Sequence, residues 1–335
     1  MRILYLSLLL GFSLLSVAQS SATTEMQERA TISASTQKAF LREDFSQMEE
    51  VSRVYRAEKS RTSSGIWKLT LFYAGIATAI DIQTREKERE AAFHELESKT
   101  MKWAQKYPSS PAAHIAHSMV LIEHGWAYRG VGYASTVKPE AWAPFRRYIA
   151  MARENLDLHK SVAAIDPRWY ETMLTVARAE GWDRDQFESL LNEALDREPL
   201  FYQTYFLALE YLLPKWHGGT SEIEAFAQDA VKRTSSQEGQ GMYARIYWFA
   251  SQTQFQNDIF TSSLAVWSRM KDGFEDVIAR YPDAWNLNNY AKFACLAQDK
   301  PKTRELLMRI ESMVEPKVWY PQSLQEQCTE WALRQ

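Results

Sequence analysis

Glycine and proline are scarce in this chain, with 12 and 11 of 335 residues. Because both residues interrupt helices, their scarcity indicates that helical segments dominate the chain. No stretch alternates apolar and polar residues over a strand's length between turn signals, so we expect no sheet. Aromatic residues make up 13% of the chain and can fill a large core. The composition therefore predicts an all-α protein.

Blocks of one charge and long apolar runs are also missing. The net charge is −3, with both signs interspersed along the chain. No basic block of the kind that binds nucleic acid or anionic lipid is present, so we expect no nucleic-acid partner. Beyond the N-terminal segment 1–18, residues 66–80 come closest to a membrane-spanning run, but Lys68 interrupts them. We expect a buried helix there and no transmembrane segment.

Signatures of catalysis and of cofactor binding are absent as well. The chain has no Gly-rich phosphate loop, no Gly-x-Ser-x-Gly elbow, no paired-cysteine metal motif and no calcium loop. His114, His117 and His124 share one predicted helix, but no carboxylate completes a metal site on that stripe. We expect a row of packed histidines, no metal and no cofactor. An enzyme whose site assembles from distant residues stays open as an alternative.

The N-terminal segment 1–18 has the layout of a secretory signal peptide. Arg2 precedes an apolar run over residues 3–17, and small residues at Ser16 and Ala18 fit a cleavage site. The alternative is an uncleaved anchor, although the run is shorter than the ~20 residues of a spanning helix. The layout predicts an exported protein, periplasmic or secreted, of a bacterium.

Behind this segment, residues 19–37 are rich in Ser, Thr, Gln and Ala and lack periodicity, which predicts a disordered leader. Residues 38–334 are expected to form a single helical-repeat domain. Within it we expect an aromatic loop at 125–136 and a polar loop at 235–241, where two subdomains could also divide. Among its helices we expect one at 267–281 and one at 291–296.

Only two cysteines are present, Cys295 and Cys328. They lie on two predicted helices that one further helix separates, a spacing that stacked repeats could bring together. In an oxidising compartment a disulfide is one alternative, and two buried free thiols are the other. The bridge would close a loop of about 34 residues and stabilise the fold by about 3–4 kcal/mol on the chain-entropy model.

Residues 166–234 carry the clearest repeat. Helical patterns meet in pairs at 181–183 and again at 214–219, and breaks fall at Pro167 and Pro199. The separation of these two prolines is close to the period of a tetratricopeptide repeat, ~34 residues. A helix pair of this size cannot bury its apolar faces alone and must stack on neighbours. The pattern predicts an α-solenoid of stacked antiparallel helix pairs, with about 13 or 14 helices.

Four segments extend this comparison: 64–69, 124–130, 213–219 and 281–297. With them the chain resembles tetratricopeptide-repeat proteins with degenerate repeats, and more narrowly a family of bacterial proteins marked by a Pro-Lys-Trp-Gly-Gly type turn. The likeness covers about residues 51–314. His217 stands where the family would have glycine. The resemblance implies a fold and no particular reaction.

Two loops are candidate binding sites. In the first, Lys215, Trp216 and His217 precede a glycine pair, which allows close approach of another chain. This loop either faces a ligand or places Trp216 as a plug between helix pairs. In the second, aromatic and guanidinium groups could bind a peptide or a sugar ring, or could pin the loop to neighbouring helices. Its residues are Trp126, Tyr128, Arg129 and Tyr133.

Three functions are compatible with these observations. The first is a non-enzymatic scaffold that binds a peptide or protein segment in its concave surface. The second is a binder of cell-envelope carbohydrate that uses exposed aromatic rings, and the third is a hydrolase. A peptide scaffold should line its groove with Asn, Lys and Arg, with the rings buried. A carbohydrate binder should expose coplanar rings, and an enzyme should converge titratable groups in a pocket.

Overall fold

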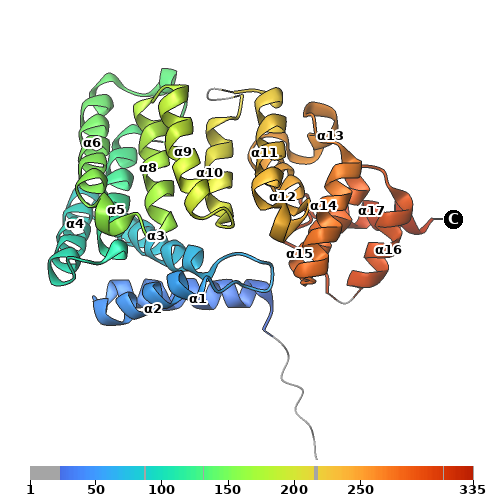
Figure 1. Ribbon diagram of the computed structural model, residues 1–335, viewed down its shortest axis with the longest axis horizontal. Helices are drawn as coiled ribbons and strands as arrows, with labels where there is room; N and C mark the ends of the chain where they lie inside the picture. Colours follow the sequence, from blue (N-terminus) through green and yellow to red (C-terminus); the bar gives the residue numbers. More distant parts are fainter. Residues whose placement is uncertain (1–22, 87, 131, 215–217, 312, 335) are drawn as a thin grey trace, which may run out of the picture.

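The computed structural model describes residues 23–334 except 87, 131, 215–217 and 312. The described chain is all-helical, and a single β-bridge between Arg61 and Trp67 lies outside the helices (Figure 1). The predicted all-α class is therefore confirmed. The proposed signal peptide lies outside the described residues. Among the described helices, none has the length and apolarity required to cross a bilayer.

Residues 25–37 are helical, whereas a disordered leader was expected at 19–37, so that prediction is wrong from residue 25 onward. Helix α1, Glu25–Leu41, starts at a capping box in which Thr24 and Gln27 exchange side-chain-to-backbone hydrogen bonds. It packs against α3. A Cβ on Gly75 of α3 would lie 2.5 Å from the carbonyl oxygen of Ser33, so only glycine permits this approach. Small residues make the contact, and α1 consequently lacks an apolar stripe.

Three helices form the N-terminal part, with α1 and α2 along one edge of the molecule at the bottom of Figure 1. Helices α4 to α12 then stand side by side in a row above them. The bounds are α2 Phe45–Glu58, α3 Lys68–Glu86, α4 Arg89–Lys106, α5 Pro111–Arg129, α6 Trp142–Leu158, α7 Lys160–Ala163, α8 Pro167–Glu180, α9 Arg184–Arg197, α10 Tyr202–Tyr211, α11 Thr220–Glu238 and α12 Gly241–Ala250.

Two predicted loops in this row are largely helical. Helix α5 continues through Gly125 to Arg129, and a 3₁₀ turn follows at Ala134–Thr136, so of the described residues in 125–136 only 130, 132 and 133 lie outside helical turns. Likewise α11 runs to Glu238, and only residues 239 and 240 separate it from α12. Gly239 has φ +55°, and Asp276 accepts a hydrogen bond from the following amide. The apolar core continues across this connection without interruption.

The C-terminal part begins with a π-helical turn, Ser251–Phe255, directly after α12. Its other elements are a 3₁₀ turn Gln256–Asp258, α13 Ile259–Ser262, α14 Trp267–Arg280, α15 Ala284–Leu296, α16 Lys300–Ile310 and α17 Ser323–Leu333. The sequence placed only residues 291–296 in a helix, whereas α15 begins seven residues earlier, where Asp283 caps its first amides. Of the two alternatives for the cysteines, the disulfide is present: Cys295 of α15 is bonded to Cys328 of α17, with Cα atoms 5.9 Å apart.

Candidate functional site

The four predicted residues of the second candidate loop lie in different surroundings. Trp126, Tyr128 and Arg129 all belong to the end of α5. The guanidinium of Arg129 lies over the rings of Trp126 and Trp142, at 4.9 and 5.3 Å from their centroids. It also donates hydrogen bonds to the carbonyls of residues 130 and 132, and burial lowers its pKa. Arg129 therefore pins the end of α5 to α6, as the structural alternative expected.

Tyr128 and Tyr133 do not join that cluster. Tyr133 is 80% exposed, and the aromatic stacks of α5 and α6 do not include it. Tyr128 faces α4, where its hydrogen bond with Glu90 raises the pKa of the phenol to about 12. The four side chains therefore do not pack as one cluster, and a binding role for them stays a prediction. Lys215, Trp216 and His217 of the first candidate loop lie outside the described residues.

The three histidines of α5 occupy separate environments. His114 stacks on His159 and contacts the Pro108 carbonyl, whereas His117 lies 2.8 Å from the Thr100 hydroxyl. Within the described chain, no three histidine, cysteine or acidic side chains are placed to hold a metal ion.

His124 is the most enclosed of the three. Its ring is fully buried between the rings of Phe93 and Tyr148, at centroid distances of 4.2 and 3.8 Å. Its two nitrogens face Glu97 and Glu90 at 2.7 and 3.2 Å. Imidazole and two carboxylates thus converge here. Because Glu90, Glu97 and Phe93 belong to α4 and Tyr148 to α6, the arrangement ties α4, α5 and α6 together.

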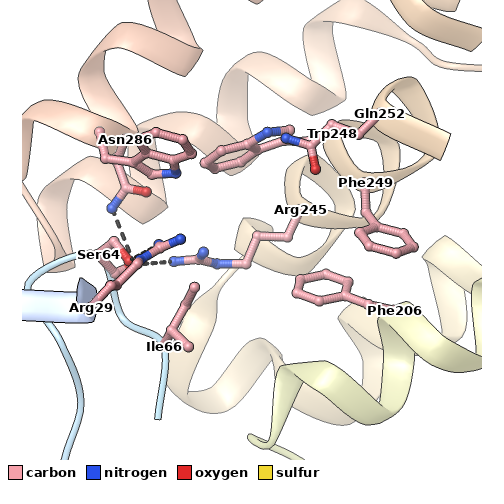
Figure 2. A pocket seen from close by; sticks show the side chains of 10 residues that line it. Arg29, Ser64, Ile66, Phe206, Arg245, Trp248, Phe249, Gln252 and Asn286 are labelled. Carbon is pink, nitrogen blue, oxygen red and sulfur yellow. Dashed lines mark hydrogen bonds between the residues drawn. The ribbon is translucent and has the colours of Figure 1, made fainter. Parts of the chain in front are cut away.

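A pocket that the sequence did not indicate lies where the segment between α2 and α3 meets α12 and α15 (Figure 2). Its volume is about 100 Å³. Figure 2 shows Arg29, Arg245 and Asn286 converging on Ser64. The lining residues are Arg29, Ser64, Ile66, Phe206, Arg245, Trp248, Phe249, Gln252, Trp285 and Asn286.

Ser64 connects the parts of this pocket through its carbonyl, its amide and its hydroxyl. Its carbonyl accepts hydrogen bonds from Arg245 Nη2 at 3.0 Å and from Asn286 Nδ2 at 3.2 Å. Its amide and hydroxyl both donate to the buried carboxylate of Glu25, at 3.0 and 2.7 Å. Burial alone would raise the pKa of Glu25, but the bonds from Ser64 and the charge of Arg29 lower it. Glu25 is therefore a charged anchor beneath the pocket floor.

Two polar groups of the pocket have unused bonding capacity. Arg245 is only 4% exposed, and Nη2 alone makes a hydrogen bond to the described residues. Within the described chain no carboxylate lies within ion-pair distance of it. Its guanidinium rests instead on the rings of Tyr202 and Tyr281, at 4.7 and 5.7 Å. Asn286 is fully buried, and its Oδ1 has no hydrogen-bond partner in the described structure.

A second pocket of about 320 Å³ adjoins the first and shares Trp248, Gln252 and Trp285 with it. It adds Asn289 and Lys292 of α15, as well as other polar and apolar groups up to Pro321. We call the two pockets together the basic groove. The described residues that line it include no Asp or Glu, and its cationic residues are Arg29, Arg245, Lys292 and Lys317.

Lys292 is the second cation in the basic groove that lacks an anion. It is half-buried, and burial lowers its pKa. The described residues include no ion-pair partner for it, whereas Arg29 pairs with Glu25 and Lys317 lies near Glu315. The groove therefore combines uncompensated positive charge with amide groups and aromatic walls.

One local signal for the groove was present in the sequence. Asn286, Asn289 and Lys292 recur every third residue, which places polar side chains on one face of α15. The expected helix began only at 291, so this face was not recognised. Comparisons of the chain with protein family models, with curated proteins and with solved structures give no match.

Proposed function

We propose that this protein is an exported, non-enzymatic helical-repeat scaffold that binds a peptide segment of another protein in the basic groove. In this proposal the helices form a solenoid of stacked pairs related to tetratricopeptide repeats. The observation that carries the proposal is the lining of the groove. Amide and cationic side chains of α12, the following turn and α15 surround it, and its aromatic rings are buried or half-buried except for Tyr320, which is exposed.

A peptide suits this lining because its backbone offers donors and acceptors in alternation. Side-chain amides can bind both kinds of group, since each carries a carbonyl oxygen and an NH₂ group. Gln252, Asn286 and Asn289 supply three amides along the groove. The smaller pocket has room for a single small group, and the larger lies near the lower end of typical ligand-site volumes, about 300–1,000 Å³. An extended segment of a few residues fits both together.

The rings of the groove favour a peptide over a carbohydrate. A sugar ring stacks on an exposed aromatic face. Among the described rings of the groove only Tyr320 is exposed, at 79%, and no described ring pair includes it. Trp248 is only 9% exposed, and its ring is inclined by 31° to that of Trp285, with centroids 6.5 Å apart, so these two do not make one flat platform. A hydrolase would need a hydroxyl of the groove beside a titratable group. Ser64 comes closest to this, but its hydroxyl donates to Glu25, a carboxylate that anchors the fold.

Export is supported by two independent features. The N-terminal segment 1–18 has the signal-peptide layout. The disulfide between Cys295 and Cys328 is of the kind that forms and persists outside the cytosol. Together they support a location in the periplasm or outside the cell.

The proposal is tested by selecting binders from a displayed library of random eight-residue peptides against the protein lacking residues 1–18. Selected peptides are then measured by fluorescence anisotropy with two variants. Gln252 is exposed and lines both pockets, so Gln252→Trp should fill the groove and weaken binding at least 10-fold. Gln254 is exposed on the same turn but lines neither pocket, so Gln254→Trp is the matched control.

Two results would contradict the proposal. One is a selection in which no peptide is enriched over a disulfide-bonded control protein. The other is equal binding of the selected peptides by the wild type and by Gln252→Trp, which would place them elsewhere on the surface. Circular dichroism of both variants checks that the fold is retained.

A further inference from the structure

The basic groove contains positive charge that the described protein does not neutralise. Arg245 is buried and Lys292 is half-buried, and neither has an ion pair among the described residues. Removing a charge from water without a partner costs several kcal/mol unless polar groups or another charge compensate it. Arg245 receives some compensation from the Ser64 carbonyl and two tyrosine rings, and Lys292 receives none that is described. A ligand with negative charge would compensate both.

The two cations are spaced along one side of the groove. Arg245 is fixed beside Asn286, because both donate to the same carbonyl of Ser64. Lys292 lies six residues after Asn286 on α15, a rise of about 9 Å. In an extended peptide, side chains two residues apart project on the same side at a separation of about 7 Å. Two flexible acidic side chains at that spacing can therefore reach both cations.

We infer that the basic groove selects acidic peptide segments, with one carboxylate bound by Arg245 and a second, two residues away, bound by Lys292. Asn286 and Asn289 lie between these two points and bind the peptide backbone. This inference depends on the proposed function and specifies its ligand. The guanidinium of Arg245 offers planar donors to a carboxylate, whereas the Lys292 ammonium acts as a point charge on a flexible stem. Burial lowers the pKa of Lys292, as expected for an ammonium group that has no anion beside it.

The test uses the peptides enriched in the selection described above. We expect Asp or Glu at two positions separated by one residue. Replacing both acids by Gln or Asn should weaken binding at least 10-fold, and raising the salt from 50 to 500 mM should weaken binding of the acidic form only. Enriched peptides that are neutral or basic, yet are blocked by Gln252→Trp, would overturn this inference and leave the proposed function standing. No enrichment at all would overturn both.

Variants of the protein assign the charge to particular residues. Lys292→Gln should weaken the acidic peptides about 10-fold, and Lys292→Glu should favour peptides in which the second acid is replaced by Lys. Lys232→Gln is the matched control, because Lys232 is exposed on α11 and lines neither pocket. Arg245→Lys is measured only after its fold is verified, since Arg245 also holds Ser64. Equal affinity of wild type and Lys292→Gln would overturn the assignment.

Discussion

The buried carboxyl of Glu171 makes the stability of this protein depend on pH in a direction that can be measured. Glu171 lies on α8 and is only 4% exposed. Its Oε2 accepts a bond from Arg168 at 2.6 Å, and its Oε1 has no described partner. Burial raises the pKa of this carboxyl, the charge of Arg168 only partly offsets that effect, and the resulting pKa is about 7.

The sign of the effect follows from the two pKa values. In the unfolded chain Glu171 titrates near 4.5, so the folded state holds the proton more firmly. The contribution of this group to stability is therefore largest below pH 4.5 and is lost as the pH rises to 7. A pKa difference of about 2.5 corresponds to a loss of about 3 kcal/mol above pH 7. Glu171→Gln removes the titration while keeping the size of the side chain.

We expect Glu171→Gln to be more stable than the wild type by about 3 kcal/mol at pH 8, and by less than about 1 kcal/mol at pH 5. Urea unfolding followed by circular dichroism at both pH values gives the free energies. Glu154→Gln, which removes an exposed carboxylate from α6, is the control and should show no such trend. If the two proteins differed equally at pH 5 and pH 8, Glu171 would not occupy the buried environment described.

Three further variants test the packing of the fold. Replacing both Cys295 and Cys328 by Ser should lower the free energy of unfolding by about 3–4 kcal/mol, and a reducing agent should then change the wild type but not the variant. Gly75→Val should force α1 away from α3, because its Cβ would lie 2.5 Å from Ser33, and amide exchange over residues 25–41 should accelerate. Glu25→Gln should cost about 2–3 kcal/mol in urea unfolding and quench or shift the tryptophan fluorescence of the groove, because the Ser64 segment loses its charged anchor.

Local patterns predicted the helices whose apolar residues recur on one face. Met270, Phe274 and Val277 recur in this way, and the expected helix at 267–281 agrees with α14 to within one residue. The pairing of the cysteines was expected as one alternative from the single helix between them, and it too is present. Period and spacing suffice here, because α14 depends on residues within one helix and the two cysteines lie on helices that only α16 separates.

The prediction is wrong at one glycine. A loop was expected to begin at Gly125, but this residue lies inside α5, where a Cβ would lie 3.3 Å from the carbonyl oxygen of Phe145 on α6. Gly75 serves the same purpose between α3 and α1. In both cases glycine permits two helices to approach closely and does not end a helix. A single sequence cannot distinguish these roles, since the partner helix is not identified locally.

The basic groove lay beyond the reach of local patterns for a related reason. Its parts come from α1, from the segment after α2, from α10, from α12 with the turns that follow it, from α15 and from residues 317–321. The bond that joins them, from Arg245 to the Ser64 carbonyl, spans 181 residues of sequence. Moreover, Arg29 belongs to the segment that was expected to be disordered. Trp126 and Arg129 were predicted as site residues because of their large side chains, but the guanidinium of Arg129 lies over the Trp126 ring, so the two contact one another.

The same bonds connect the groove to the first helix of the domain. Glu25 of α1 holds the amide and hydroxyl of Ser64, and the Ser64 carbonyl positions both Arg245 and Asn286. A ligand that completes the bonding of Arg245 therefore stabilises only those molecules in which α1 is docked. At a ligand concentration 100 times the Kd, this linkage contributes about 2.7 kcal/mol to the folded state. Occupation of the groove should consequently slow amide exchange in α1, although Arg29 is the only residue of that helix that lines the groove. Arg29 and Ser64 thus make α1 and the segment after α2 part of the proposed binding site.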